Sequence, residues 1–201
     1  MDKKLLWIGI SIFLLVTLGV FLAFTFAQPP SFRGTSFAEP FPLATEIALT
    51  KADGTEFRLS EQRDKIVLLF FGYTSCPDVC PTTLAEMKQV VDALGEDAQH
   101  VQVVFVSVDP DRDTPEKIQT YVEHFHPSFI GLSGQFSELE PIWNGYSIVR
   151  EEVESDSAFG TIINHTARSF LVDRQGNLRL TYAYQTPIND IVYDIRLLLE
   201  Q

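Results

Sequence analysis

The sequence predicts an α/β fold in which helices flank a mixed central sheet, with one transmembrane helix ahead of it. Two continuous apolar runs, residues 65–71 and 101–108, are typical of strands covered on both faces, and a helix signal follows each of them. Turn signals near both ends of the domain indicate hairpins, which add antiparallel pairs to the sheet. With 201 residues, 45% of them hydrophobic, the chain is long enough for one well-packed domain and an appendage.

Residues 1–27 are expected to anchor the chain in a membrane. Residues 5–27 carry no charge and would span about 34 Å as a helix, against roughly 30 Å for a bilayer core. Lys3 and Lys4 precede this run, so the positive-inside rule leaves the N-terminus in the cytoplasm and the domain outside it. The short N-terminus lacks an Arg-rich transit segment, which favours a single-pass protein of a bacterial plasma membrane with a periplasmic domain. A cleaved signal peptide is the alternative, because the letters TFA before Gln28 resemble a cleavage site.

A tether and the start of the domain follow. Residues 28–42 combine proline, glycine and serine without periodicity, as expected of a flexible tether, and the domain is expected to span residues 43–201. Residues 46–60 alternate apolar and polar side chains around Asp53-Gly54, which predicts an N-terminal hairpin. The first apolar run then predicts a buried strand that ends at Gly72.

The rest of the domain is predicted to alternate helices and strands. Leu84, Met87 and Val91 recur at helical spacing after Pro81, and a glycine follows as a stop signal. Thr114 before a proline is typical of a helix N-cap. The further elements expected are a helix from there to about residue 125, a helix over 135–146, a strand over 146–153, a hairpin about residues 174–177 and an amphipathic helix over 187–199.

The net charge of −12 argues against one class of partner. Nucleic acid is not expected to bind, because contacts to phosphates require a basic surface. An acidic surface instead suits solubility, a basic patch on a partner protein, or a cation.

Cys76 and Cys80 are the only cysteines of the chain, and three residues separate them. A structural disulfide explains the pair poorly, because so small a loop removes little chain entropy. We expect a brief turn from Pro77 to Cys80 and a new helix start at Pro81, since proline would break a continuing helix. Both sulfurs would then lie on one face at a helix N-terminus. Free amides and the helix dipole there favour the thiolates that metal binding and disulfide exchange require.

A stable metal site needs a third donor, and the chain has four histidines: His100, His124, His126 and His165. His100 follows a polar turn, and His124 and His126 end a helix, where a cation suits the dipole. His165 precedes a strand, in a loop at the sheet end that could reach the cysteines. From spacing alone, a structural role and metal ligation both stay open for it.

Three segments together resemble the Sco/SenC family of membrane-tethered copper chaperones: FFGYTSCPDVCP, VSVDPDRDTPE and NHTARSFLVDRQG. The resemblance covers about residues 43–200, with the motifs in the family's order and spacing. It implies a thioredoxin-like fold with an extra hairpin. It also implies copper bound by the two motif cysteines and the later histidine, which here are Cys76, Cys80 and His165.

Three further residues are judged against the family pattern. Many relatives have aspartate before the histidine, whereas this chain has Asn164, so an acidic partner of the imidazole is missing. Asp78 and Asp109 fall in motif positions. They are assigned as supporting residues, with Asp109 organising the loop after the second buried strand, and not as direct ligands.

The resemblance implies a chaperone that delivers copper to the binuclear copper centre of cytochrome c oxidase subunit II or to a similar acceptor protein. Soft thiolates select Cu(I), and the imidazole extends the site toward Cu(II). The alternative is a thiol-disulfide oxidoreductase, in which the cysteine pair reduces the acceptor's cysteines before metal loading. Whether the chain is an enzyme therefore stays open, with a metallochaperone as the primary hypothesis. A peroxidase-like protein or a structural zinc domain is the third hypothesis, although no fourth zinc ligand is evident.

Overall fold

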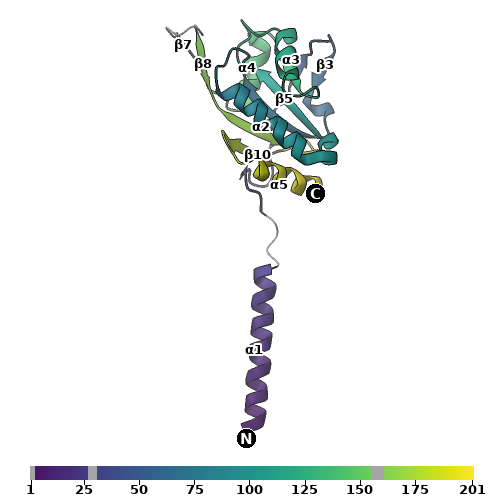
Figure 1. Cartoon of the computed structure of the whole chain (residues 1–201), viewed down its shortest axis with the longest axis vertical. Helices are drawn as coiled ribbons and strands as arrows, with labels where there is room; N and C mark the ends of the chain where they lie inside the picture. Colours follow the sequence, from purple (N-terminus) through teal and green to yellow (C-terminus); the bar gives the residue numbers. More distant parts are fainter. Residues whose placement is uncertain (1–2, 27–30, 155–160) are drawn as a thin grey trace. The chain divides into compact units, whose positions relative to one another are not determined.

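A six-stranded sheet forms the centre of the domain (Figure 1). The computed structural model describes residues 3–26, 31–154 and 161–201. In spatial order the strands are β1 (Thr35–Ser36), β10 (Leu178–Ala183), β9 (Arg168–Val172), β4 (Ile66–Gly72), β5 (Val101–Ser107) and β6 (Ile130–Leu132). β4 pairs in parallel with β5 and antiparallel with β9, so the mixed sheet is confirmed.

Helices cover both faces of this sheet. The helical elements of the domain are η1 (Leu59–Glu61), α2 (Val79–Leu94), η2 (Gly95–His100), α3 (Pro115–Glu123), α4 (Phe136–Gly145) and α5 (Ile188–Leu199). On one face Phe70 stacks with Phe105, and Phe105 contacts Tyr121 of α3. α2 and α5 pack against each other on that same side. On the opposite face Phe71 contacts Tyr146, which follows α4. Every residue of β4 and β5 is buried, which confirms the two strands predicted from apolar runs.

α2 begins earlier than predicted and runs through Pro81 without a break. Val79, Cys80 and Pro81 are its first three residues, and Thr82 N donates to Asp78 O at 3.2 Å. The first amides of a helix have no acceptor within it, so a proline there forfeits no hydrogen bond. The predicted new start at Pro81 is therefore wrong, and Cys80 lies in the first turn of α2 itself.

Two small sheets lie outside the central one. β2 (Ala48–Thr50) and β3 (Glu56–Arg58) form the hairpin predicted around Asp53-Gly54, where Gly54 has a φ of 80°. The second small sheet pairs β7 (Arg150–Val153) with β8 (Ile162–His165). The sequence predicts the first strand of this pair but not the second, because residues 161–165 are short and lack a turn signal of their own. Residues 155–160, between these two strands, lie outside the described residues.

Residues 33–37 pack on the domain, which differs from the flexible tether predicted over residues 28–42. β1 pairs antiparallel with β10, and Phe37 N donates to Arg179 O at 3.0 Å. The compact unit accordingly begins at Phe32. The sequence carries no local signal of this contact, because the partner strand lies near the other end of the chain.

A buried carboxylate on α5 holds this segment. Asp194 is fully buried, and its two oxygens accept hydrogen bonds from Arg33 N and Gly34 N, both at 2.8 Å. The hydroxyl of Tyr182 donates to the same carboxylate at 3.2 Å. Three donors thus satisfy a charge that would otherwise be costly to bury.

α1 (Lys3–Phe26) confirms the helix predicted over residues 5–27. Within the described part of the chain, however, no helix combines the length and the hydropathy needed to cross a membrane.

Replacing the carboxylate on α5 tests how the N-terminal segment is held. We expect Asp194→Asn to lower the free energy of unfolding by about 3 kcal/mol, because an amide nitrogen would face N–H donors that now meet a charged acceptor. Chemical denaturation measures this difference. Asp97→Asn is the matched control, since Asp97 is exposed in its ion pair with Arg196, and its effect should stay within about 0.5 kcal/mol. Equal effects in the two variants would contradict the role of Asp194.

Candidate metal centre

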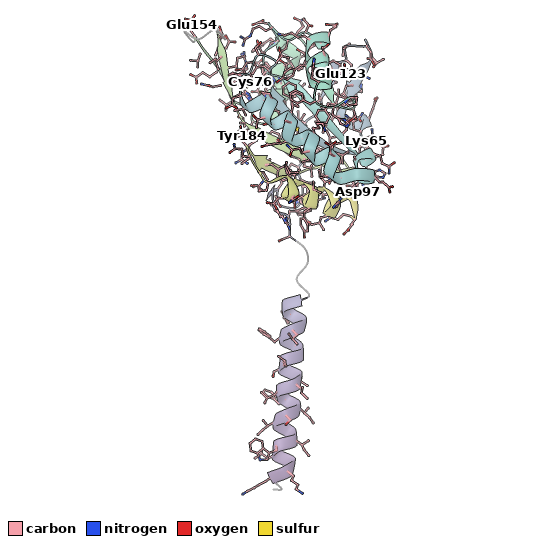
Figure 2. The ribbon with its side chains drawn as sticks, in the orientation of Figure 1. Lys65, Cys76, Asp97, Glu123, Glu154 and Tyr184 are labelled. Carbon is pink, nitrogen blue, oxygen red and sulfur yellow. The ribbon has the colours of Figure 1, made fainter. Side chains whose placement is uncertain are left out.

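Cys76, Cys80 and His165 converge at the N-terminal end of α2. Figure 2 shows Cys76 beside the start of that helix. The ligand atoms of the three residues all lie within 4.8 Å of one another, and Cys80 Sγ is 3.6 Å from His165 Nε2. Among the residues described, this is the one such group of three that could hold a metal ion. A loop, a helix and a strand each supply one donor.

Gly72, the last residue of β4, makes room for the Cys80 thiol. A Cβ atom there would lie 2.7 Å from Cys80 Sγ and 2.6 Å from a ring carbon of Phe105. Both separations are far inside van der Waals contact, so any side chain would displace the sulfur or the ring. Sequence analysis identifies Gly72 only as a strand end, because the Phe105 contact comes from another strand.

The two cysteines differ in protonation. A hydrogen bond from the Cys80 thiol lowers the pKa of Cys76 to about 4, and bonds from His165 and from the amides of Cys80 and Asp78 also lower it, against the effect of burial. The same thiol–thiolate bond raises the pKa of Cys80, as do burial and the charge of Cys76. At neutral pH the metal-free pair is therefore the Cys76 thiolate and the Cys80 thiol. The sequence predicts two thiolates, but like charges in contact in a buried site disfavour the second ionisation.

The imidazole of His165 is held on several sides. Its Nδ1 lies 3.2 Å from Thr166 O, and its Nε2 lies 3.6 Å from Cys80 Sγ, so the ring is held between the backbone and the cysteines. The ring packs edge-on against Tyr73 and Phe70, with centroids 5.9 and 6.3 Å away. His165 is the last residue of β8, not part of a loop as expected. Because the Thr166 carbonyl contacts Nδ1, orienting the ring does not depend on Asn164.

Asp78 and Asp109 lie outside the converging group. Asp78 precedes α2, lines the pocket described below, and makes no side-chain capping bond. Asp109 is buried, accepts a hydrogen bond from Arg112 Nε at 2.5 Å, and has its pKa raised by burial. Neither is positioned as a ligand, and their supporting roles stay predictions.

The centre opens through a pocket of about 180 Å³. Pro77, Val79 and Ile162 are among its apolar lining residues, and Cys76 and His165 also line it. Cys76 is only partly buried, whereas Cys80 is fully buried. An incoming ligand or partner side chain therefore meets Cys76 and the imidazole before it reaches Cys80.

Residues 36–200 match the family model described as SCO1/SenC. The chain therefore belongs to the SCO1/SenC family. Among curated relatives, the SCO2-like protein of Rickettsia felis is 33% identical over 132 residues, which cover 65% of this chain and 64% of that protein. The match thus spans slightly less than two thirds of that relative's length.

Solved structures of family members have the same fold. The apo Sco1 protein of Thermus thermophilus, solved in solution, has a TM-score of 0.74 and 38% identity, covering 84% of this chain and 97% of that one. The ScoI protein of Bradyrhizobium japonicum, solved with copper bound, has a TM-score of 0.70 and 33% identity, covering 78% of this chain and 99% of that one. The α/β thioredoxin-like fold is thereby confirmed.

The thiol of Cys80 is expected to control the reactivity of Cys76. In the reduced, metal-free protein, alkylation of Cys76 should stay fast from neutral pH down and decline only as pH falls through about 4, where the thiolate is protonated. Cys80→Ala removes the donor, so the pKa of Cys76 should rise toward an ordinary thiol value and the decline should begin at higher pH. Cys80→Ser keeps a hydroxyl donor and should shift the profile less. The pH dependence of the alkylation rate measures these shifts. If both variants gave the same pH profile as the native protein, the Cys80 thiol would not be the group that lowers the pKa of Cys76.

Proposed function

We propose that this SCO1/SenC protein is a copper chaperone, which binds copper through Cys76, Cys80 and His165 and passes it to a copper-acceptor protein. The observation that carries the proposal is the convergence of two sulfurs and one imidazole nitrogen within 4.8 Å. The acceptor that the family resemblance implies is the binuclear copper centre in subunit II of cytochrome c oxidase.

The donor set fits copper chemically. Two sulfurs favour the soft ion Cu(I), and an imidazole also suits Cu(II), so the same residues can follow a change of oxidation state. Donors on opposite sides of a first-row metal ion, each about 2.3 Å from it, lie about 4.6 Å apart. The three ligand atoms lie within 4.8 Å of one another, so only small movements are needed to hold an ion. Structural zinc fits less well, because the group offers three donors and closed zinc sites use four.

The exposure of the donors suits transfer. A carrier must release its metal by ligand exchange, so an acceptor's side chain has to reach the ion while the carrier still holds it. Cys76 and His165 line the open pocket, whereas Cys80 is fully buried and does not line it. An acceptor can therefore displace two of the three donors before the protein surface has to open.

The Cys76 thiolate also supports a second candidate function, the reduction of a disulfide in the acceptor. The thiolate would attack one acceptor sulfur, forming a mixed disulfide and releasing the other sulfur as a thiolate. Cys80, after passing its proton to that thiolate, would then attack Cys76. This attack would release the acceptor with one thiol and one thiolate. The acceptor would have gained two electrons, which the two cysteines lose as they form the Cys76–Cys80 disulfide. Because thioredoxin-type motifs have two residues between their cysteines and this chain has three, we favour copper delivery.

Removal of each donor tests copper binding. The reduced protein should bind one copper ion, and Cys76→Ser or Cys80→Ser should abolish binding, because one sulfur and one nitrogen hold Cu(I) weakly. His165→Ala should retain Cu(I) on the two sulfurs but lose the nitrogen signal from the electron paramagnetic resonance spectrum of Cu(II). His124→Ala is the control, since that imidazole is exposed at the end of α3 and contacts Thr120 O. An unchanged Cu(II) spectrum in His165→Ala would remove His165 from the site.

A rescue experiment separates delivery from reduction. Cells that carry Cys76→Ser with Cys80→Ser should fail to assemble active oxidase. If the protein delivers copper, added copper should restore oxidase activity and a membrane-permeant reductant alone should not. Restoration by the reductant alone would instead favour the reductase. The native chain in the same cells is the control for both additions.

A further inference from the structure

The segment 109–113, in the middle of the motif VSVDPDRDTPE, contacts both halves of the metal centre. Asp113 accepts hydrogen bonds from Thr74 N at 3.0 Å and from Thr74 Oγ1 at 2.5 Å, and Thr74 lies just ahead of the two cysteines. Arg112 NH1 donates to Thr161 O at 2.8 Å, just ahead of the strand that ends in His165. One short segment therefore links the cysteine loop to the histidine strand, a role that the proposed function does not use.

The strand that carries His165 needs such a link. β8 pairs only with β7, in a two-stranded sheet separate from the central one. A two-stranded ribbon is marginally stable by itself in water. Beyond the cysteine contact of His165, Ile163 N donates to Tyr73 OH at 3.2 Å, and Arg112 bonds to Thr161 O, just before the strand, among the described residues. The partner strand β7 is joined to the body by Arg150 Nε, which donates to Val108 O at 2.9 Å. The position of the imidazole thus depends on its ring contacts with Tyr73 and Phe70 and on few hydrogen bonds from this ribbon to the domain body.

Arg112 is built to make one of these contacts. Its Nε bonds to the buried carboxylate of Asp109, and its Cζ lies 5.6 Å from the centroid of the Tyr73 ring. The same ring contacts His165 edge-on. Arg112 NH2 is buried without a hydrogen-bond partner among the residues described, which costs free energy. The Arg112 side chain is held in place by its hydrogen bonds to Asp109 and Thr161 and by its contact with the Tyr73 ring, and these contacts offset that cost.

We propose that Arg112 is a positioning residue, which holds Thr161 and with it β8, and so keeps His165 Nε2 over the cysteine pair. Thr161 lies four residues before His165, about 13 Å along an extended strand, so a loosened attachment moves the imidazole. The cysteine loop is held separately, through Thr74 and Asp113, and stays in place. The consequence for copper rests on the proposed function, whereas the consequence for the metal-free protein does not.

Arg112→Gln tests this in the full chain, first without metal. We expect the Ile163 amide to exchange its hydrogen at least about tenfold faster, and the nuclear Overhauser contacts between the His165 and Tyr73 rings to disappear. With copper added, Cu(I) stoichiometry should be unchanged. Affinity for Cu(II) should fall by about tenfold, with loss of the nitrogen signal, as is typical when a group that orients a metal ligand is removed. In a His165→Ala background, Arg112→Gln should cause no further loss.

Two more variants control the result. Arg196→Gln is the matched control, because Arg196 also donates to a carboxylate and a carbonyl, those of Asp97 and Ala93, and it should leave every measurement unchanged. Arg112→Lys keeps the charge beside Asp109 but lacks the planar fork that reaches two acceptors, so it should behave like Arg112→Gln.

Two results with the Arg112 variants would overturn the positioning role of Arg112. Native ring contacts and native Ile163 exchange in folded Arg112→Gln would overturn the proposal. Global unfolding of both Arg112 variants would also overturn it, because a positioning residue leaves the rest of the domain intact. If the native chain binds no copper, the proposed function fails, but the metal-free measurements still decide the role of Arg112.

Discussion

The parallel, in-register pairing of β4 with β5 is the constraint on which the site depends. Gly72 lies opposite Ser107, and Val108 N donates to Gly72 O at 2.8 Å, so the two strands end at the same level. The loops that follow them, one with the cysteines and the other with residues 109–113, therefore start side by side. Loops at the carboxyl ends of parallel strands commonly form binding sites for this reason.

A buried carboxylate turns this proximity into a defined geometry. Asp113 accepts hydrogen bonds from Thr74 and also from Ser107 Oγ at 2.9 Å, and Lys117 Nζ lies 3.5 Å from it. Hydrogen bonds to a charged group each contribute about 1.5–3 kcal/mol, whereas a buried carboxylate without partners would be strongly unfavourable. The buried Asp113 carboxylate is therefore stable only while Thr74, Ser107 and Lys117 contact it. The loop before Cys76 is thus positioned by a residue that lies far away in the sequence.

This division between local and distant contacts explains what the sequence could predict. The buried strands, the helices after them and the hairpin at Gly54 follow from periodicity, turn chemistry and caps, all of which are local. The cysteine pair was visible as a site because its short spacing suits few other roles. His165 needed the family resemblance, because its approach to Cys80 depends on an unpredicted strand, β8. Gly72 and Arg112 were missed for the same reason, since the atoms that explain them come from other strands and loops.

The proton that Cys80 retains, through its hydrogen bond to Cys76 and its burial, also has a role in the proposed function. The metal-free cysteine pair carries one negative charge, on the Cys76 thiolate, since the pKa of Cys80 is raised. Binding of Cu(I) requires that Cys80 lose its proton, and two thiolates with one monovalent cation again carry one negative charge. Exchange of a proton for Cu(I) thus leaves the charge of a largely buried pair unchanged, and avoids the desolvation cost of an added charge. Cu(II) instead makes the pair with its ion neutral, so the two oxidation states differ by one charge in a chain whose net charge is already −12. The thiol that the hydrogen bond to Cys76 and burial maintain is therefore also the group whose proton Cu(I) replaces.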